Sequence, residues 1–196
     1  MKANASFLMR ALLFALALLP LRAQALERDI TNALQTVGGT YSSIYIHEFG
    51  HALAFKAFGA TAITIEVPPK GKILGGLTTA QLQTPLSPGQ RQINAVSGLL
   101  ASSLAGEFVL QRRSLHHSPY AQAVLGTAVL SNLRHTYTYY TRIVGRDGYT
   151  GNDIDYFEQA GGNPHLFSAA LITYAAWTLQ RMKKEGIPLF YVDLHF

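Results

Sequence analysis

The segment His47-Glu48-Phe49-Gly50-His51 carries the residues best suited to chemistry. It has the pattern H-E-x-x-H, in which two histidines four positions apart lie on one face of a helix and can bind one metal ion. Zn²⁺ held in this way lowers the pKa of a water ligand to about 7, so that Glu48 can take its proton and pass it to a leaving group. The motif predicts a zinc-dependent hydrolase with His47 and His51 as metal ligands and Glu48 as the general base.

A catalytic zinc site of this kind needs a third protein ligand. Because the chain contains no cysteine, that ligand has to be a histidine or a carboxylate. Asp153, the first choice, and Asp155 lie in a turn that could return a carboxylate to the motif, although Asp153 could instead cap a short helix. Glu107 lies inside an apolar helix, and His135 lies on an aromatic stretch where a structural role is more common. The remaining histidines are interpreted as surface or turn residues: His116, His117, His165 and His195.

The motif lies within residues 40–58, whose composition suits a helix. Gly38 and Gly39 precede this segment, and Gly59 is placed where a helix would stop. Three residues at its start are candidate N-caps: Thr40, Ser42 and Ser43. The sequence therefore predicts a helix that begins after the two glycines and carries the motif in its middle.

The segment after the motif helix has the pattern of a β-hairpin. Residues 61–67 alternate apolar and polar side chains, residues 68–71 break the pattern, and residues 73–79 could return as a second strand. Three later apolar segments predict further helices, at residues 93–110, 121–133 and 166–179. The expected fold is mainly α: a bundle of about four helices, several apolar enough to be membrane-embedded, with a small β-hairpin after the motif helix.

The N-terminus is a separate unit of residues 1–25. Lys2 and Arg10 precede the apolar run 11–21, and small residues at Ala23 and Ala25 offer a cleavage site. This layout predicts a signal peptide or, if it is not cleaved, an N-terminal membrane anchor. A chain of 196 residues leaves room for one further domain, so we expect residues 26–196 to form a single metallopeptidase-like domain.

Charge and hydropathy limit the partners. Residues 26–196 carry 13 basic and 11 acidic residues, which argues against a nucleic-acid partner. The apolar segments predict contact with a lipid bilayer and a multi-pass protein of a membrane like the bacterial inner membrane. The basic clusters at residues 112–113 and 181–184 should mark cytoplasmic ends, yet no simple alternation satisfies both if all four apolar segments span.

Residues 47–54, running on to Phe58-Gly59-Ala60, resemble the active-site helix of the site-2-protease-like (M50-type) membrane zinc metallopeptidases. The segment 61–79 resembles the hairpin that follows that helix, and residues 95–101 resemble the small-residue helix after it. In that family a distant aspartate is the third zinc ligand, which the resemblance carries onto Asp153. It implies hydrolysis of peptide bonds within or next to a membrane, with a membrane-associated protein or peptide as substrate.

Two other functions compete with this one. The first is an exported, soluble zinc peptidase that takes Glu107 as its third ligand. The second is a non-catalytic membrane adaptor in which zinc is a structural clamp and the small residues of the helix at 93–110 bind partner helices. The presence of Glu48 argues against the adaptor, because a structural zinc site needs no base and is usually closed by four protein ligands.

Overall fold

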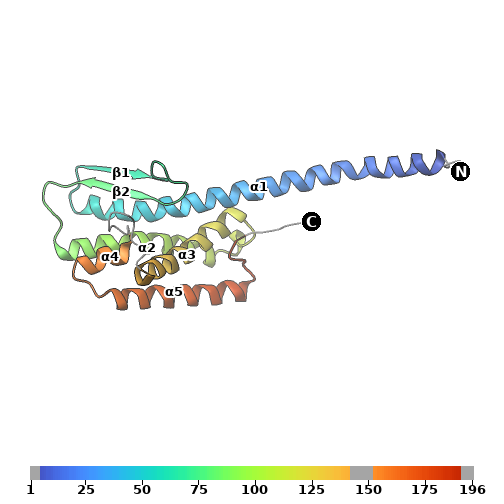
Figure 1. The fold of residues 1–196 in the computed structure, drawn as a ribbon. Coiled ribbons are helices and arrows are strands. Elements are labelled where there is room, and N and C mark those ends of the chain that lie inside the picture. Colours follow the sequence, from blue (N-terminus) through green and yellow to red (C-terminus); the bar gives the residue numbers. More distant parts are fainter. Residues whose placement is uncertain (1–4, 142–151, 191–196) are drawn as a thin grey trace.

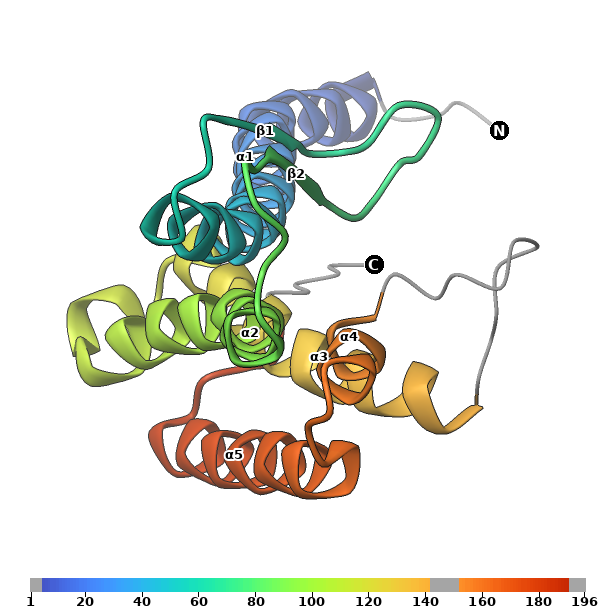
Figure 2. The same ribbon diagram turned by 90° about the vertical axis from the view of Figure 1, so that its left-hand side faces the viewer.

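A computed structural model describes residues 5–141 and 152–190, with side chains for residues 26–141 and 152–190. It is mainly helical with one small antiparallel hairpin, which confirms the expected fold class. Figure 1 shows α1 along one side of the bundle, with its N-terminal part extending beyond it. In Figure 2 the hairpin and α1 lie on one side, α5 lies on the other, and α2 and α3 lie between them. The elements are α1 (Ala5–Ala57), β1 (Ala62–Glu66), β2 (Leu77–Gln81), α2 (Pro88–Gln111), the 3₁₀ helix η1 (Arg113–Leu115), α3 (Pro119–Thr141), α4 (Asp153–Gln159) and α5 (Pro164–Glu185).

The motif helix α1 is much longer than expected. It runs without a break through Gly38 and Gly39, so the three predicted N-caps are wrong: Thr40, Ser42 and Ser43 all lie inside the helix. Gly39 serves packing instead, because a Cβ there would collide with the backbone carbonyl of Tyr120 where α1 lies against α3. Residues 1–4 and the side chains of residues 5–25, which belong to the predicted signal or anchor, lie outside the described residues.

Helix α1 ends just before Gly59, as the sequence predicted. Gly59 has a φ of 87°, a left-handed conformation that suits glycine. Its N–H donates to the carbonyl of Lys56, and the N–H of Ala60 donates to the carbonyl of Phe55. These two bonds form a Schellman motif, which satisfies carbonyls at the end of the helix and turns the chain into β1.

The hairpin packs against the motif end of α1. In its register Thr64 pairs with Thr79 and Glu66 pairs with Leu77. The second strand begins at Leu77, four residues later than the sequence predicted. Gly75 has a φ of 110°, and Gly76 lies against the side chain of Glu48. The chain at 73–76 therefore follows the surface of α1 before it can pair with β1.

Helices α2 and α5 are bounded by strong caps and extend beyond their apolar runs. Ser87 and Gln90 form a capping box at the start of α2, with Pro88 in the first turn. Asn163 caps α5, and Gly186 ends it in a left-handed conformation. The buried side chains between α2, α3 and α5 form the larger core cluster, which includes Leu110, Leu125, Val129, Ala175 and Met182.

One described helix, α2, is long and apolar enough to cross a membrane, in a search that did not extend to the run at 11–21. The described residues thus do not support the multi-pass arrangement that the sequence predicted. Arg113 Nε lies 3.8 Å from Glu185, and Arg181 donates to Glu107, so the C-terminal ends of α2 and α5 lie at the same end of the bundle. Both basic clusters therefore lie at that end.

Candidate metal centre

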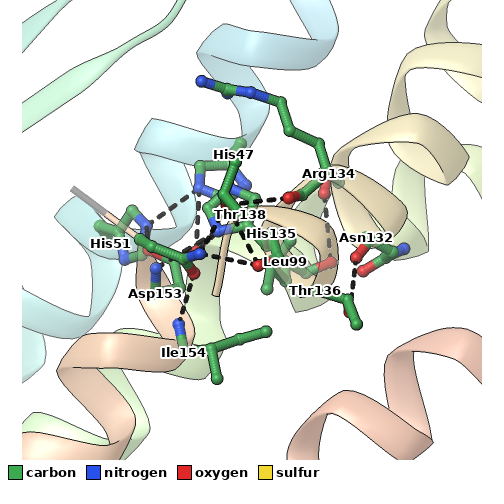
Figure 3. A network of polar contacts seen from close by, with 12 residues as sticks. His47, His51, Leu99, Asn132, Arg134, His135, Thr136, Thr138, Asp153 and Ile154 are labelled. Atoms are coloured by element: carbon green, nitrogen blue, oxygen red, sulfur yellow. Dashed lines mark hydrogen bonds and ion pairs between the residues drawn. The ribbon is translucent and has the colours of Figure 1, made fainter. Parts of the chain in front are cut away.

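Three side chains that the sequence singled out converge at one buried point (Figure 3). The Nε2 atoms of His47 and His51 are 3.2 Å apart. Asp153 reaches them from α4, with Oδ2 3.2 Å from His47 Nε2 and Oδ1 3.4 Å from His51 Nε2. His135 on α3 is the fourth member, because His47, His135 and Asp153 offer ligand atoms within 4.8 Å of one another. The buried group of His47, His135 and Asp153 could hold a metal ion.

Three observations fit a cation at this point. A tetrahedral ion with bonds of about 2.0–2.1 Å separates its ligand atoms by about 3.3 Å, close to the spacings among His47, His51 and Asp153. Buried Oδ2 of Asp153 accepts no hydrogen bond from the described chain, although a buried carboxylate oxygen normally has a partner. On the α2 side, a Cβ on Gly98 would collide with His51 and lie 2.7 Å from Nε2 of His47, so only glycine leaves this space open.

Hydrogen bonds outside the cluster orient its ligands. Nδ1 of His51 donates to the carbonyl of Asn94 at 2.8 Å, and Asn94 Nδ2 donates back to the carbonyl of His51 at 3.1 Å. With its proton on Nδ1, neutral His51 presents the lone pair of Nε2 to the cluster. Asn152 caps α4 by accepting from the N–H of Ile154 and so fixes the start of the helix that carries Asp153. Neither asparagine was identified from the sequence.

The charges within the cluster favour a cation. Burial raises the pKa of Asp153, but the imidazoles of His135 and His47 outweigh burial and hold this pKa well below its usual range. Burial lowers the pKa of His51, yet Asp153 outweighs it and raises this pKa to about 8. Burial lowers the pKa of His135 to about 4. A proton on His51 therefore competes with a metal ion, and the affinity for metal should fall as the pH drops below about 8.

Glu48 lies beside the cluster and is held by the hairpin. The hydroxyl of Thr78 donates to Oε2 of Glu48 at 2.7 Å and lies 3.0 Å from the Glu48 backbone carbonyl. A Cβ on Gly76 would collide with the Glu48 side chain, so the hairpin lies directly against it. One carboxylate oxygen of the predicted base is thus fixed by Thr78.

The cluster opens into a cavity of about 1330 Å³. His47, Glu48 and His51 line it from α1, and His135 and Asp153 line it from α3 and α4. The rest of the lining is mostly apolar and includes Leu74 and Leu77 of the hairpin, Leu86 of the loop before α2, and Ala95 of α2. A substrate in this cavity would contact both the metal ligands and the base.

The other candidate ligands have different places. Glu107 accepts two hydrogen bonds from Arg181, at 2.7 and 2.9 Å, and is not part of the described metal-binding group. Asp155 lies two residues after Asp153 on α4 and is partly exposed. His116 lies in the turn after η1, as one of the two predicted alternatives had it, but it is buried and bonded to the carbonyl of Leu110. His117 and His165 are exposed as predicted, and His195 lies outside the described residues.

Replacement of Gly98 by alanine is expected to weaken zinc binding by roughly tenfold to hundredfold, because the new methyl group would displace both motif imidazoles. Gly89→Ala is the matched control on the same helix, since a Cβ there meets nothing within 4 Å. Competition with a chromophoric chelator measures the affinity, and circular dichroism checks the fold. Wild-type affinity in Gly98→Ala would show that the imidazoles do not lie against α2.

Comparison with known protein families, curated proteins and solved structures finds no match for this chain.

Proposed function

We propose that this chain is a zinc-dependent metallopeptidase that hydrolyses peptide bonds within or next to a membrane. The observation that carries the proposal is the convergence of His47, His51 and Asp153 beside Glu48 in one cavity. Two imidazoles and one carboxylate are a ligand set typical of catalytic zinc, and it leaves a position open for water. The resemblance of the motif helix to the site-2-protease-like metallopeptidases points to the same chemistry.

Each residue of the site has its own role in the proposed reaction. His47, His51 and Asp153 would hold Zn²⁺, which when bound acidifies a water molecule and polarises a carbonyl group. Glu48 takes a proton from the attacking water as the new C–O bond forms at the carbonyl carbon. It then gives that proton to the amine nitrogen as the C–N bond breaks. Thr78 holds Oε2 of Glu48 so that the carboxylate keeps one orientation throughout.

The cavity favours an extended chain over a small molecule. Its volume of about 1330 Å³ is larger than the roughly 300–1,000 Å³ of small-molecule pockets. Apolar residues from the hairpin and from the loop before α2 make up much of its wall, including Leu74, Leu77 and Leu86. An extended peptide segment fits such a cavity better than a small metabolite does.

Exposed apolar side chains support a place at a membrane. Leu100, Leu104 and Phe108 project from α2, the helix that could cross a bilayer, and each is more than half exposed. Such a row on the surface of a soluble protein would be costly, whereas lipid would cover it. The soluble alternative has less support, because its third zinc ligand would be Glu107, whose carboxylate accepts hydrogen bonds from Arg181. We therefore place the chain in or on a membrane, with α2 as the candidate span.

A direct test uses the full chain purified in detergent and a library of quenched fluorescent peptides. We expect cleavage that stops when 1,10-phenanthroline removes the metal and returns when Zn²⁺ is added. We also expect the chain to stay with membranes during an alkaline carbonate wash. A zinc-loaded, folded chain that cleaves no member of the library would contradict the peptidase proposal, and release by the wash would contradict membrane embedding.

A further inference from the structure

His135 is the one member of the buried cluster without a role in the proposed mechanism. The residue is 8 % exposed, and its ring centroid lies 5.4 Å from that of His47. It lines the same cavity as Glu48, but it comes from α3 instead of the motif helix. Its position leaves two roles open: a further metal ligand, or a group that touches the substrate.

The hydrogen bonds of the ring distinguish these roles. The backbone N–H of Asp153 donates to Nδ1 of His135 at 3.3 Å. Asp153 is the first residue of α4, where the N–H has no partner within the helix and must find one elsewhere. In this arrangement Nδ1, which also lies 3.7 Å from Oδ2 of Asp153, uses its lone pair on the N–H and not on a metal ion. A neutral imidazole whose Nδ1 accepts carries its proton on Nε2, which becomes a donor.

The surroundings hold His135 in place. Nδ2 of Asn152 donates to the backbone carbonyl of His135 at 2.7 Å and to the hydroxyl of Thr138 at 2.6 Å. Asn152 is 3 % exposed and also caps α4, so one side chain ties His135 to the helix of Asp153. A donor fixed in this way needs no rearrangement when charge develops beside it, which is the condition for effective stabilisation of a transition state.

We propose that Nε2–H of His135 donates a hydrogen bond to the carbonyl oxygen of the scissile peptide, which becomes negatively charged when water adds to its carbon. This inference rests on the proposed peptidase function. The proton stays on Nε2 throughout, so His135 takes part in no proton transfer. The hydrogen bond strengthens as the charge forms and would raise kcat more than it lowers KM.

Two variants test the proposal. His135→Phe keeps a ring but removes the donor, and His135→Gln places an amide N–H close to the position of Nε2. We expect both variants to keep about one zinc per chain, because His135 is not a ligand in this proposal. We expect His135→Phe to lower kcat by about 10²–10³-fold with little change in KM, and His135→Gln to recover part of the loss.

A second measurement does not depend on turnover. Co²⁺-loaded protein is titrated with inorganic phosphate, a simple oxyanion, while the visible absorption of the metal is followed. We expect His135→Phe to bind phosphate roughly tenfold to hundredfold more weakly than the wild type does, with an unchanged metal spectrum before phosphate is added. This result would support the donor role even if no peptide is cleaved, in which case only the peptidase proposal fails.

Three results would overturn the inference. Loss of zinc from folded His135→Phe, or a changed Co²⁺ spectrum, would make His135 a fourth ligand and the site a closed one, as in structural zinc sites. Equal phosphate affinity in wild type and His135→Phe would remove the donor role. A proton on Nδ1 instead of Nε2, measured by long-range ¹H–¹⁵N correlation of the ring, would contradict the hydrogen bond from Asp153 on which the argument depends.

Discussion

Replacement of Glu48 by glutamine is expected to lower peptide cleavage by about 10²–10⁴-fold, while the chain keeps its zinc. Glutamine has the shape of glutamate, and its carbonyl oxygen can still accept the hydrogen bond that Thr78 gives to Oε2. It cannot take a proton from water at neutral pH, so the step that requires a base is lost. The measurements are kcat on a cleaved peptide and elemental mass spectrometry on the same preparation.

Glu107→Gln is the matched control for this experiment. It makes the same chemical change on the neighbouring helix α2, where Glu107 accepts from Arg181 and Gln111 instead of facing the cluster. Its kcat should stay close to that of the wild type, although the weakened contact with Arg181 can lower stability. Unchanged turnover in Glu48→Gln would rule out Glu48 as the base. Equal losses in both variants would point to a general effect on folding instead.

The geometry of the motif residues was predictable from the sequence because it is set by one helix. His47 and His51 share a face at a spacing of four residues, and Gly59 ends their helix as expected. The mainly α fold with a hairpin was also predictable, since the apolar runs and the alternation after the motif are local patterns. Asp153 came from a turn-rich segment and from a family resemblance, and the structure brings it to within 3.4 Å of both histidines.

The supporting residues were not predictable, because their roles exist only where two helices meet. Asn94 and Gly98 lie four positions apart on α2, and they matter because that face of α2 lies against the motif histidines. In the sequence His135 lies on a separate aromatic segment, where a structural histidine is the common case. Its relation to Asp153 arises from the way α4 packs beside α3.

The start of the motif helix was also not predictable, again because it depends on a contact between two helices. Two adjacent glycines normally favour a break in a helix, so a new helix after Gly39 was the reasonable prediction. In the folded chain Gly39 lies against the backbone of Tyr120, and a side chain at that position would hold α1 away from α3. Close packing between helices therefore outweighs the poor helix propensity of glycine here, at a cost of roughly 1 kcal/mol per residue.

Replacement of Asp153 by alanine is expected to remove zinc from the purified chain, from about one ion per chain in the wild type to almost none. The change deletes a ligand, and even loss of an outer partner of a ligand costs about 10–100-fold in affinity, so we expect more than 100-fold here. Elemental mass spectrometry after dialysis measures the content, and circular dichroism shows whether the variant is folded.

Two variants separate Asp153 from its rivals. Asp155→Ala changes the carboxylate two residues further along α4, and Glu107→Gln changes the one that Arg181 binds. Both should keep the wild-type zinc content if Asp153 is the ligand. Zinc retained in Asp153→Ala but lost in Asp155→Ala would identify Asp155 as the third ligand instead of Asp153. Loss of zinc in Glu107→Gln would favour the soluble peptidase, in which Glu107 is the third ligand. The hydrogen bonds between Glu107 and Arg181 would then have to open to admit the metal.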